Sequence, residues 1–447
     1  MVKLSGTFSS IQPFQALVLG DFMLDTYTTG RVKRVSPEAP VLVMEVQNLE
    51  SRPGGAGNVV LNLVTLGARV VAVGRTGADR EGDELRGRLG REGVDVSGLV
   101  IEPTSKTPVK NRLIADSQQL LRVDLETIAP LGAELERSVV AFLEQMIPTV
   151  QVVAVSDYGK GFLTQGVLSA AIRIARDCKI PIIIDPKGID FVKYKGANVL
   201  KPNLSEAYAA AKLPQSAPLD AVAKELLRIS EVDLVLITRS EAGMSIFSKE
   251  GKRTDFPVRS KEVKDVTGAG DTVLSMISLG LANGIDITVA AQLANIAAGI
   301  SIERLGCAQV TLSEIARRLL EFDADTKIFD ESHTYALRQV LKGKKYSLLV
   351  LNQGQGMTNS LFRTIRELSN KKESELIIYV RGSNPNDEFV HLLSSLNEVD
   401  FIVLETESLK HLCETIHPHE VFYLEDNQLV QAQELISALL NPNYPTT

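Results

Sequence analysis

The sequence predicts an α/β fold with a mostly parallel sheet, and two observations support that prediction. Short continuous apolar runs, such as QALVLG (15–20), QVVAVS (151–156) and DLVLIT (233–238), alternate with stretches of helical spacing. Apolar strands interleaved with helices are typical of parallel sheets covered on both faces. A polar interruption, EFDADTK (321–327), then precedes a second and smaller α/β series. We therefore expect two domains, at residues 1–322 and 323–447.

The elements of the first series follow in a regular order. Predicted strands lie at residues 15–20, 41–46, 69–74, 151–156, 181–185, 197–200 and 233–238, with two more within 108–126. Predicted helices lie at 57–67, 132–146, 163–177, 203–211, 218–230, 270–283, 287–302 and 311–321. Ligands of such sheets bind beyond the carboxyl ends of the strands. Asp21, Asp157, Asp185 and Thr238 lie at or just past such ends.

Composition excludes several classes of function. The formal net charge of −7 gives no electrostatic basis for binding nucleic acid or an anionic membrane. No apolar run reaches the length of about 18 residues needed to span a membrane, and the N-terminus lacks the apolar segment of a secretory signal. Three cysteines without paired spacing indicate a cytoplasmic, reduced protein without structural zinc. All five histidines lie beyond residue 330, so a base in the first domain must be a carboxylate, a lysine or a tyrosine.

The stretch DVTGAGDTVL (265–274) carries the chemistry of the first domain. A glycine-rich turn that opens a helix presents unpaired N–H groups and the positive end of the helix dipole, and so can hold a phosphoryl group. Gly268, Ala269 and Gly270 would form this turn. Asp271 beside it can accept a proton from a hydroxyl that attacks the phosphate. A plain N-cap on a tight turn is the alternative. The P-loop and dinucleotide-binding fingerprints are both absent from the sequence.

A second glycine-rich turn lies in RPGGAGNVVLNLVTLGA (52–68). Gly54 and Gly55 would let the backbone approach a ligand closely, and Asn58 offers an amide that can both donate and accept hydrogen bonds. The alternative is a loop that only requires positive φ angles.

Together these two segments resemble the two signatures of the PfkB (ribokinase-like) carbohydrate kinases, and the resemblance spans residues 12–320. It implies a doubly wound α/β fold with a small β-sheet lid, ATP and Mg²⁺ as cofactors, and Asp271 as the catalytic aspartate. Hairpins at 28–50 and 105–126 would form the lid. Lids of this family often pair between subunits, so the resemblance also implies a homodimer.

A narrower resemblance, to the heptose 7-phosphate kinases of lipopolysaccharide-core synthesis, rests on GDFMLDTYTTGRVKRVSPEAPVLVMEV (20–46), QQLLRVDLE (118–126), SDYGKG (156–161), DPKG (185–188) and KPNLSEA (201–207). It implies phosphorylation of the anomeric hydroxyl of D-glycero-D-manno-heptose 7-phosphate, to give the 1,7-bisphosphate. The implied acceptor site comprises Asp21, Asp25, Gly54, Gly55, Asn58 and Asp157. Arg112, Arg122, Lys160 and Lys187 are the candidate cations for the 7-phosphate.

The same resemblance assigns residues to the nucleotide. Asn203, Leu204, Ser205 and Glu206 match the family's nucleotide segment, and Glu206 would order Mg²⁺ through water, because Mg²⁺ favours few protein ligands. Thr238, Arg239 and Gly243 belong to a loop on the nucleotide side, with Arg239 near phosphate. Asn295 would lie near the adenine.

Many relatives carry a second domain, a nucleotidyltransferase with an H-x-G-H motif that makes ADP-heptose. In TKIFDESHTYAL (326–337), Phe329, Asp330 and His333 match that context, but Ala336 replaces the second histidine. We therefore expect a degenerate, inactive nucleotidyltransferase-like domain. Two alternatives to the heptose kinase are another kinase of this family, acting on an unphosphorylated sugar or a nucleoside, and a non-catalytic scaffold of the same fold.

Overall fold

The computed structural model describes residues 11–432, except 117, 259–262, 305, 323–326, 330–333, 353–355, 371–373, 383–386, 405–407 and 426–427. The chain forms two compact units, one spanning Pro13–Val310 and the other formed by the chain from Thr311 onward together with Ile11 and Gln12. The boundary predicted at residues 322–323 coincides with the end of helix α10 (Leu312–Phe322). The structure divides earlier because α10 packs against α11 (Thr334–Leu341) and so belongs with the second unit.

A nine-stranded sheet forms the centre of the first unit, with its strands in the order β13-β12-β11-β10-β9-β8-β1-β4-β5. The strands are β1 (Gln15–Gly20), β4 (Arg69–Gly77), β5 (Asp95–Glu102), β8 (Val152–Ser156), β9 (Ile182–Asp185), β10 (Val199–Leu200), β11 (Leu234–Thr238), β12 (Met244–Ser248) and β13 (Arg253–Phe256). Pairing is parallel from β5 to β11 and antiparallel at β12 and β13. The predicted, mostly parallel sheet is therefore confirmed.

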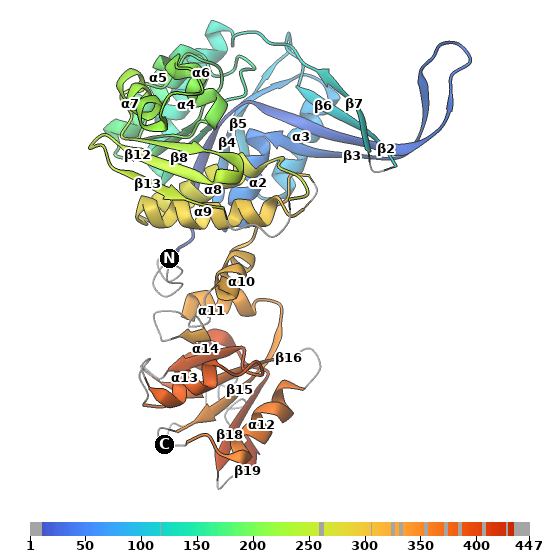
Figure 1. The fold of residues 1–447 in the computed structure, drawn as a ribbon. Helices are drawn as coiled ribbons and strands as arrows, with labels where there is room; N and C mark the ends of the chain where they lie inside the picture. Colours follow the sequence, from blue (N-terminus) through green and yellow to red (C-terminus); the bar gives the residue numbers. More distant parts are fainter. Residues whose placement is uncertain are drawn as a thin grey trace. The chain divides into compact units, whose positions relative to one another are not determined.

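Helices cover both faces of this sheet (Figure 1). Helices α4 (Ala133–Met146), α5 (Gln165–Asp177), α6 (Leu204–Ala211) and α7 (Leu219–Ser230) pack their apolar sides onto the strands in one continuous core. On the other face lie α2 (Ala56–Thr65), α8 (Ala269–Ala282) and α9 (Ile287–Ser301), with α8 packed between the other two. Helix α3 (Arg80–Arg91) precedes β5. No described helix is long and apolar enough to cross a membrane.

A four-stranded sheet, in the order β3-β2-β6-β7, forms the predicted lid. Its strands are β2 (Phe22–Val35), β3 (Leu42–Gly55), β6 (Val109–Ala115) and β7 (Gln118–Leu125). Both predicted hairpins are present, and the β2–β3 hairpin extends well beyond β6 and β7 as the blue arm of Figure 1. Strand β2 begins one residue after Asp21, so the lid grows directly from the carboxyl end of β1.

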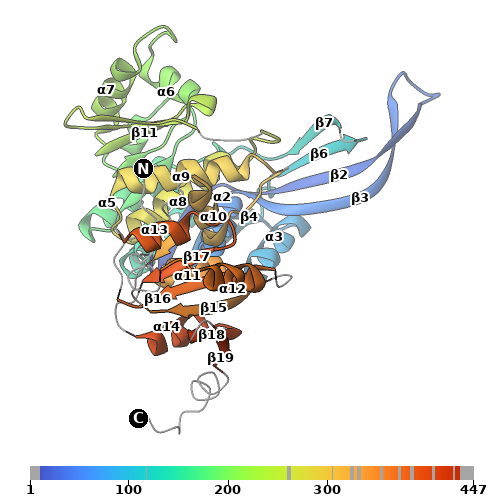
Figure 2. The same ribbon diagram turned by 60° about the horizontal axis from the view of Figure 1, so that its bottom comes forward.

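The second unit contains a smaller sheet in the order β14-β17-β16-β15-β18-β19 (Figure 2). Its strands are β14 (Ile328–Phe329), β15 (Lys345–Leu351), β16 (Ser374–Val380), β17 (Phe401–Leu404), β18 (Glu420–Glu425) and β19 (Gln428–Gln431). Helices α12 (Asn359–Ser369), α13 (Glu388–Ser394) and α14 (Leu409–Ile416) separate the strands that follow β15. All pairs are parallel except β18–β19, which agrees with the predicted second α/β domain.

Candidate active site

The glycine-rich turn before α8 forms the centre of the site. Gly268 has φ +80°, and α8 begins at the next residue. A β-carbon at Gly268 would lie 3.0 Å from Asn58 Nδ2 and 3.3 Å from Cys307 Sγ, so both the conformation and the available space require glycine. The first N–H groups of a helix lack intrahelical partners. Ala269 and Gly270 line a cavity at this end of α8, so the turn can receive an anion there.

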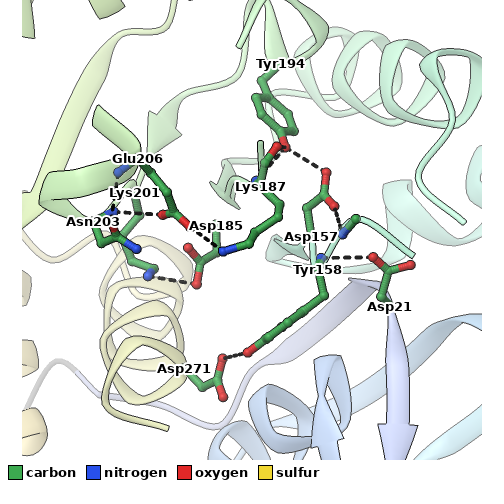
Figure 3. A network of polar contacts seen from close by, with 11 residues as sticks. Asp21, Asp157, Tyr158, Asp185, Lys187, Tyr194, Lys201, Asn203, Glu206 and Asp271 are labelled. Carbon is green, nitrogen blue, oxygen red and sulfur yellow. Dashed lines mark hydrogen bonds and ion pairs between the residues drawn. The ribbon is translucent and has the colours of Figure 1, made fainter. Parts of the chain in front are cut away.

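Asp271, in the first turn of α8, is 5% exposed and held from both sides. Asn58 Nδ2 donates to its Oδ2 at 2.6 Å. The Tyr158 hydroxyl donates to its Oδ1 at 3.0 Å (Figure 3). Burial raises the pKa of Asp271, while the bond from Asn58 and the charge of Lys201 oppose the rise. The fold thus joins Asp271 to Asn58, which lies 213 residues away in the sequence. Tyr158 was not among the predicted residues, although the SDYGKG segment contains it.

On the acceptor side, Asp25 lies within β2 and its Oδ1 pairs with Arg112 Nη1 of β6 at 2.5 Å. Gly54 lies beside this pair, where a β-carbon would be only 2.1 Å from Asp25 Oδ2. Gly55 follows as the N-cap of α2, the helix that carries Asn58. Four of the predicted acceptor residues therefore cluster where the lid approaches Asp271, namely Asp25, Gly54 and Arg112 on the lid strands and Asn58 on α2.

Asp21, at the end of β1, uses one carboxylate oxygen within the protein. Its Oδ2 accepts the backbone N–H groups of Tyr158 at 2.9 Å and Lys160 at 3.0 Å, and burial raises its pKa. The side chain therefore fixes the loop after β8 to the end of β1. Asp21 thus positions residues of the site through Oδ2, while its Oδ1 is buried and has no hydrogen-bond partner among the described residues. The predicted contact of Asp21 with a sugar hydroxyl stays a prediction.

Asp157 is also used within the protein. Its Oδ2 accepts from Lys193 Nζ at 2.6 Å and from the Tyr194 hydroxyl at 2.7 Å, and its Oδ1 accepts the N–H of Gly159 at 2.7 Å. With three partners and a side chain only 1% exposed, Asp157 anchors the segment around Tyr194. The expected role as an acceptor ligand does not fit these contacts.

We expect Asp157→Asn to lower the free energy of unfolding by about 1–3 kcal/mol, because Lys193 and Tyr194 lose a buried anionic partner. The KM for the acceptor should change little. Denaturant unfolding and steady-state kinetics measure the two effects. A large rise in that KM at unchanged stability would return Asp157 to the acceptor site.

A cavity of about 830 Å³ lies on the other side of the turn. Its lining includes the predicted nucleotide residues Asn203, Glu206, Thr238, Gly243 and Asn295. Three other predicted nucleotide residues are not part of the lining, namely Leu204, Ser205 and Arg239.

The local contacts explain these exceptions. Leu204 and Ser205 form the exposed first turn of α6. Arg239 is turned toward its own loop, where its Nη2 donates to the carbonyl of Ala242 at 3.0 Å and lies 3.4 Å from Asp255.

Lys187 lines this same cavity and not the lid. Its Nζ pairs with Glu206 Oε1 at 2.7 Å, and Glu206 Oε2 accepts the N–H of Asn203 at 3.1 Å in a capping box that begins α6. The prediction grouped Lys187 with Arg112, Arg122 and Lys160 as a cation for the acceptor phosphate. The structure instead places it on the nucleotide side.

A buried ion pair that the prediction missed lies between these groups. Lys201 Nζ is 2.8 Å from Asp185 Oδ2, and the lysine side chain is 3% exposed (Figure 3). A β-carbon at Gly270 would lie 3.5 Å from the same ammonium, so Lys201 lies directly beside the anion-binding turn. Burial and the charges of Asp271 and Glu206 raise the pKa of Asp185 to about 6, against the effect of Lys201. The sequence signal that could have indicated this pair is the lysine of KPN (201–203), which directly precedes the predicted nucleotide residue Asn203.

The carboxylates at this cavity fit a magnesium ion. Among the described residues, no group of three or more acidic, histidine or cysteine side chains forms a closed metal site. Mg²⁺ usually binds through one or two carboxylates together with water and substrate phosphates. Asp185 and Glu206 both line the cavity. Burial is the main cause of the raised pKa of Asp185, and the negative charges of Asp271 and Glu206 add to it.

Comparison with known proteins agrees with this geometry. The model of the pfkB family of carbohydrate kinases matches residues 15–314, which include the lid, the two glycine-rich turns and the cavity. The chain belongs to this family. It is therefore a sugar kinase.

Bifunctional proteins of the same family match nearly the whole chain. The bifunctional protein HldE of Geobacter metallireducens is 38% identical over 443 residues, covering 92% of this chain and 88% of that protein. The protein of the same name from Trichlorobacter lovleyi is 44% identical over 325 residues, covering 72% of this chain and 66% of that protein. This pfkB kinase is thus similar to HldE proteins across both of its units.

Solved structures establish the fold of the pfkB unit. The ribokinase of Arabidopsis thaliana, solved with ribose and ATP, aligns with a TM-score of 0.55 at 16% identity, over 69% of this chain and 99% of that one. Phosphofructokinase-2 of Escherichia coli aligns with a TM-score of 0.58 at 17% identity, over 69% and 98%. At these identities the likeness concerns the ribokinase-like fold alone.

Proposed function

We propose that the first unit transfers the γ-phosphoryl group of ATP to the anomeric hydroxyl of D-glycero-β-D-manno-heptose 7-phosphate, giving the 1,7-bisphosphate for ADP-heptose and lipopolysaccharide-core synthesis. The observation that carries the proposal is the position of Asp271. It lies between the cavity lined by Asn203 and Glu206 and the lid residues Asp25 and Arg112. The HldE relatives and the heptose-kinase motifs support the choice of sugar.

In the proposed reaction Asp271 is the general base. Its carboxylate accepts the proton of the acceptor hydroxyl while the hydroxyl oxygen attacks the phosphorus. Asn58 and Tyr158 each donate one hydrogen bond to it and fix its orientation. The raised pKa of Asp271 makes it a stronger base than an exposed aspartate.

The transferring phosphoryl group would lie against the N–H groups at the start of α8. Lys201 lies beside this turn and adds a fixed positive charge where negative charge develops in the transition state. Asp185 keeps the ammonium in place. These groups are positioned by the fold before the substrates bind, so they cost no reorganisation during the reaction.

ATP would occupy the cavity of about 830 Å³, with its phosphates toward Gly270 and its base toward Asn295. Asp185 and Glu206 would hold Mg²⁺ there, directly or through water. When bound, the ion neutralises charge on the β- and γ-phosphates during transfer. Removal of divalent metal by chelation should therefore abolish turnover.

The main alternative is a kinase for an unphosphorylated sugar or a nucleoside. The heptose-kinase motifs of the sequence support a phosphorylated sugar, whereas Arg112, Arg122 and Lys160 on the acceptor side are each paired with a carboxylate. Rates measured with heptose 7-phosphate, heptose and a nucleoside separate these options. A higher kcat/KM for either unphosphorylated acceptor would overturn the proposal.

We also propose that the protein acts in the cytoplasm as a homodimer joined through the lid. The extended β2–β3 hairpin exposes apolar side chains that a second lid could bury, namely Val35, Val41, Leu42, Val46 and Leu49. Sedimentation of the intact chain tests this. Replacing Leu42 and Leu49 with serine should shift a dimer to monomer, and an unaltered sedimentation coefficient would contradict the proposed interface.

For the second unit we propose that adenylyl transfer is absent. The order of its strands reverses at β15, and ligands of such sheets bind beyond the strand ends at that point. The sequence after β15, NQGQGMT (352–358), contains no histidine. The partial motif match lies ahead of β15, with Phe329 in β14, while Asp330 and His333 lie outside the described residues.

We expect the intact chain to form no ADP-heptose from ATP and heptose 1-phosphate, because the sequence after β15 supplies no histidine to stabilise the reacting triphosphate. Mass spectrometry of the products measures this directly. A steady yield of ADP-heptose that persists in Asp271→Asn would show that the second unit is active.

A further inference from the structure

We infer that Lys110 is the residue that selects a phosphorylated acceptor, by binding a phosphate at the end of the sugar remote from the reacting hydroxyl. The inference rests on the proposed transfer to a sugar phosphate and assigns a residue to its specificity. The resemblance to heptose kinases indicated four other cations for this phosphate, and Lys110 was not among them.

Strand register places Lys110 in a row of charged lid residues. Lys110 is the cross-strand neighbour of Asp25 on β2 and of Asp124 on β7. Arg112, two residues along β6, is paired in the same way with Tyr27 and Arg122. Directly paired residues project from the same face of a sheet, so these side chains share one face of the lid.

The predicted cations of this region already have carboxylate partners. Arg112 pairs with Asp25 at 2.5 Å, and Arg122 pairs with Asp124 at 2.8 Å. Lys160 pairs with Glu126 at 2.6 Å. In each pair a carboxylate of the protein already balances the positive charge, so no ligand is needed.

Lys110 differs from them. Its Nζ lies 5.4 Å from the centre of the Tyr158 ring, and within the described part of the chain it makes no ion pair. Burial and the nearby charges of Lys160 and Arg122 lower its pKa, although Asp25 and Asp124 counter part of this effect. A half-buried ammonium beside other cations is favourable only when an anion joins it.

Tyr158 connects this cation to the reacting centre. Its hydroxyl donates to Asp271, and its ring faces Lys110, so one tyrosine side chain separates the base from the ammonium. A sugar whose hydroxyl reaches Asp271 would extend its other end along this ring. A phosphate there would form a charge-assisted contact with Lys110, whereas an unphosphorylated sugar would leave the ammonium uncompensated.

The test compares Lys110→Met with the wild-type chain on heptose 7-phosphate and on heptose. We expect KM for the phosphorylated sugar to rise about 10- to 100-fold, as for a lost charge-assisted hydrogen bond, with kcat changed much less. The ratio of kcat/KM between the two sugars should fall by the same factor. Lys110→Arg should retain most of the preference. Lys106→Met, at an exposed lysine four residues earlier, is the matched control and should behave as wild type.

The outcomes separate this inference from the proposed function. An unchanged KM for heptose 7-phosphate in a folded Lys110→Met chain overturns the role of Lys110. A wild-type chain that prefers another acceptor overturns the proposed substrate. The role of Lys110 is then tested by acetylation of its amine followed by mass spectrometry. Protection of Lys110 by inorganic phosphate would support the anion site, and no protection would overturn it.

Discussion

The Asp271→Asn variant is expected to lose about 10²–10⁴ in kcat while still binding ATP, because an amide cannot accept the proton of the attacking hydroxyl. The change removes little volume and keeps one oxygen, so one of the two hydrogen bonds, from Asn58 or Tyr158, can still form. Loss of the base should lower kcat and kcat/KM alike. Steady-state kinetics and calorimetric titration with ATP measure the two effects.

Asp286→Asn is the matched control for this variant. Asp286 is an exposed aspartate at the N-cap of α9, where it accepts a hydrogen bond from the Thr288 backbone at 2.9 Å. Its replacement should cost some helix stability and leave the rate unchanged. Near-normal turnover by Asp271→Asn would remove Asp271 from the role of base and leave it as a residue that joins α8 to Asn58 and Tyr158. The alternative of a plain N-cap is wrong, because the N-cap of α8 is Gly268.

Lys201→Met is expected to lower both the rate and the stability. The variant leaves Asp185 buried without its partner at 2.8 Å, and breaking a buried pair in this way costs about 3–5 kcal/mol. It also removes a positive charge beside the anion-binding turn, which should cost about 10²–10³ in kcat. Chemical unfolding and steady-state kinetics measure the two effects separately.

A double variant distinguishes catalysis from folding. Lys201→Met with Asp185→Asn removes both charges, so we expect stability to recover in large part. The rate should stay below that of Asp185→Asn alone, which lacks the same proposed metal ligand. Lys187→Met serves as a control, because its pair with Glu206 is half exposed and should contribute only about 0–1 kcal/mol. Recovery of the rate in the double variant to that of Asp185→Asn would mean that Lys201 acts only through stability.

The parts of the site that the sequence could predict are those with a strong local signal. Glycine-rich segments just before two helices indicated the turn at Gly268 and the close approach of the backbone at Gly54 to Asp25. Both turns contribute to the site. Asp271 and Asn58 followed from the same segments. These predictions depend on backbone geometry within a few residues, which sequence patterns describe well.

Partners across the fold could not be predicted in the same way. The end of a strand indicated where Asp21 and Asp157 lie. It did not indicate that two backbone N–H groups bind one oxygen of Asp21, or that Lys193 and Tyr194 bind Asp157. Tyr158 and Lys201 are ordinary residue types, and they matter because the fold sets them beside Asp271 and Gly270. Contacts between residues far apart in the sequence depend on tertiary packing, so a local sequence pattern cannot predict them.

We propose above all that Asp271 directs phosphoryl transfer from ATP to the anomeric hydroxyl of a sugar that already carries a phosphate. Phosphorus NMR of the product formed by the intact chain from Mg-ATP and heptose 7-phosphate tests this most directly. We predict a second phosphate on the anomeric carbon, formed by the wild-type chain and nearly absent with Asp271→Asn. A phosphate on any other carbon, or equal product from both chains, would contradict the account.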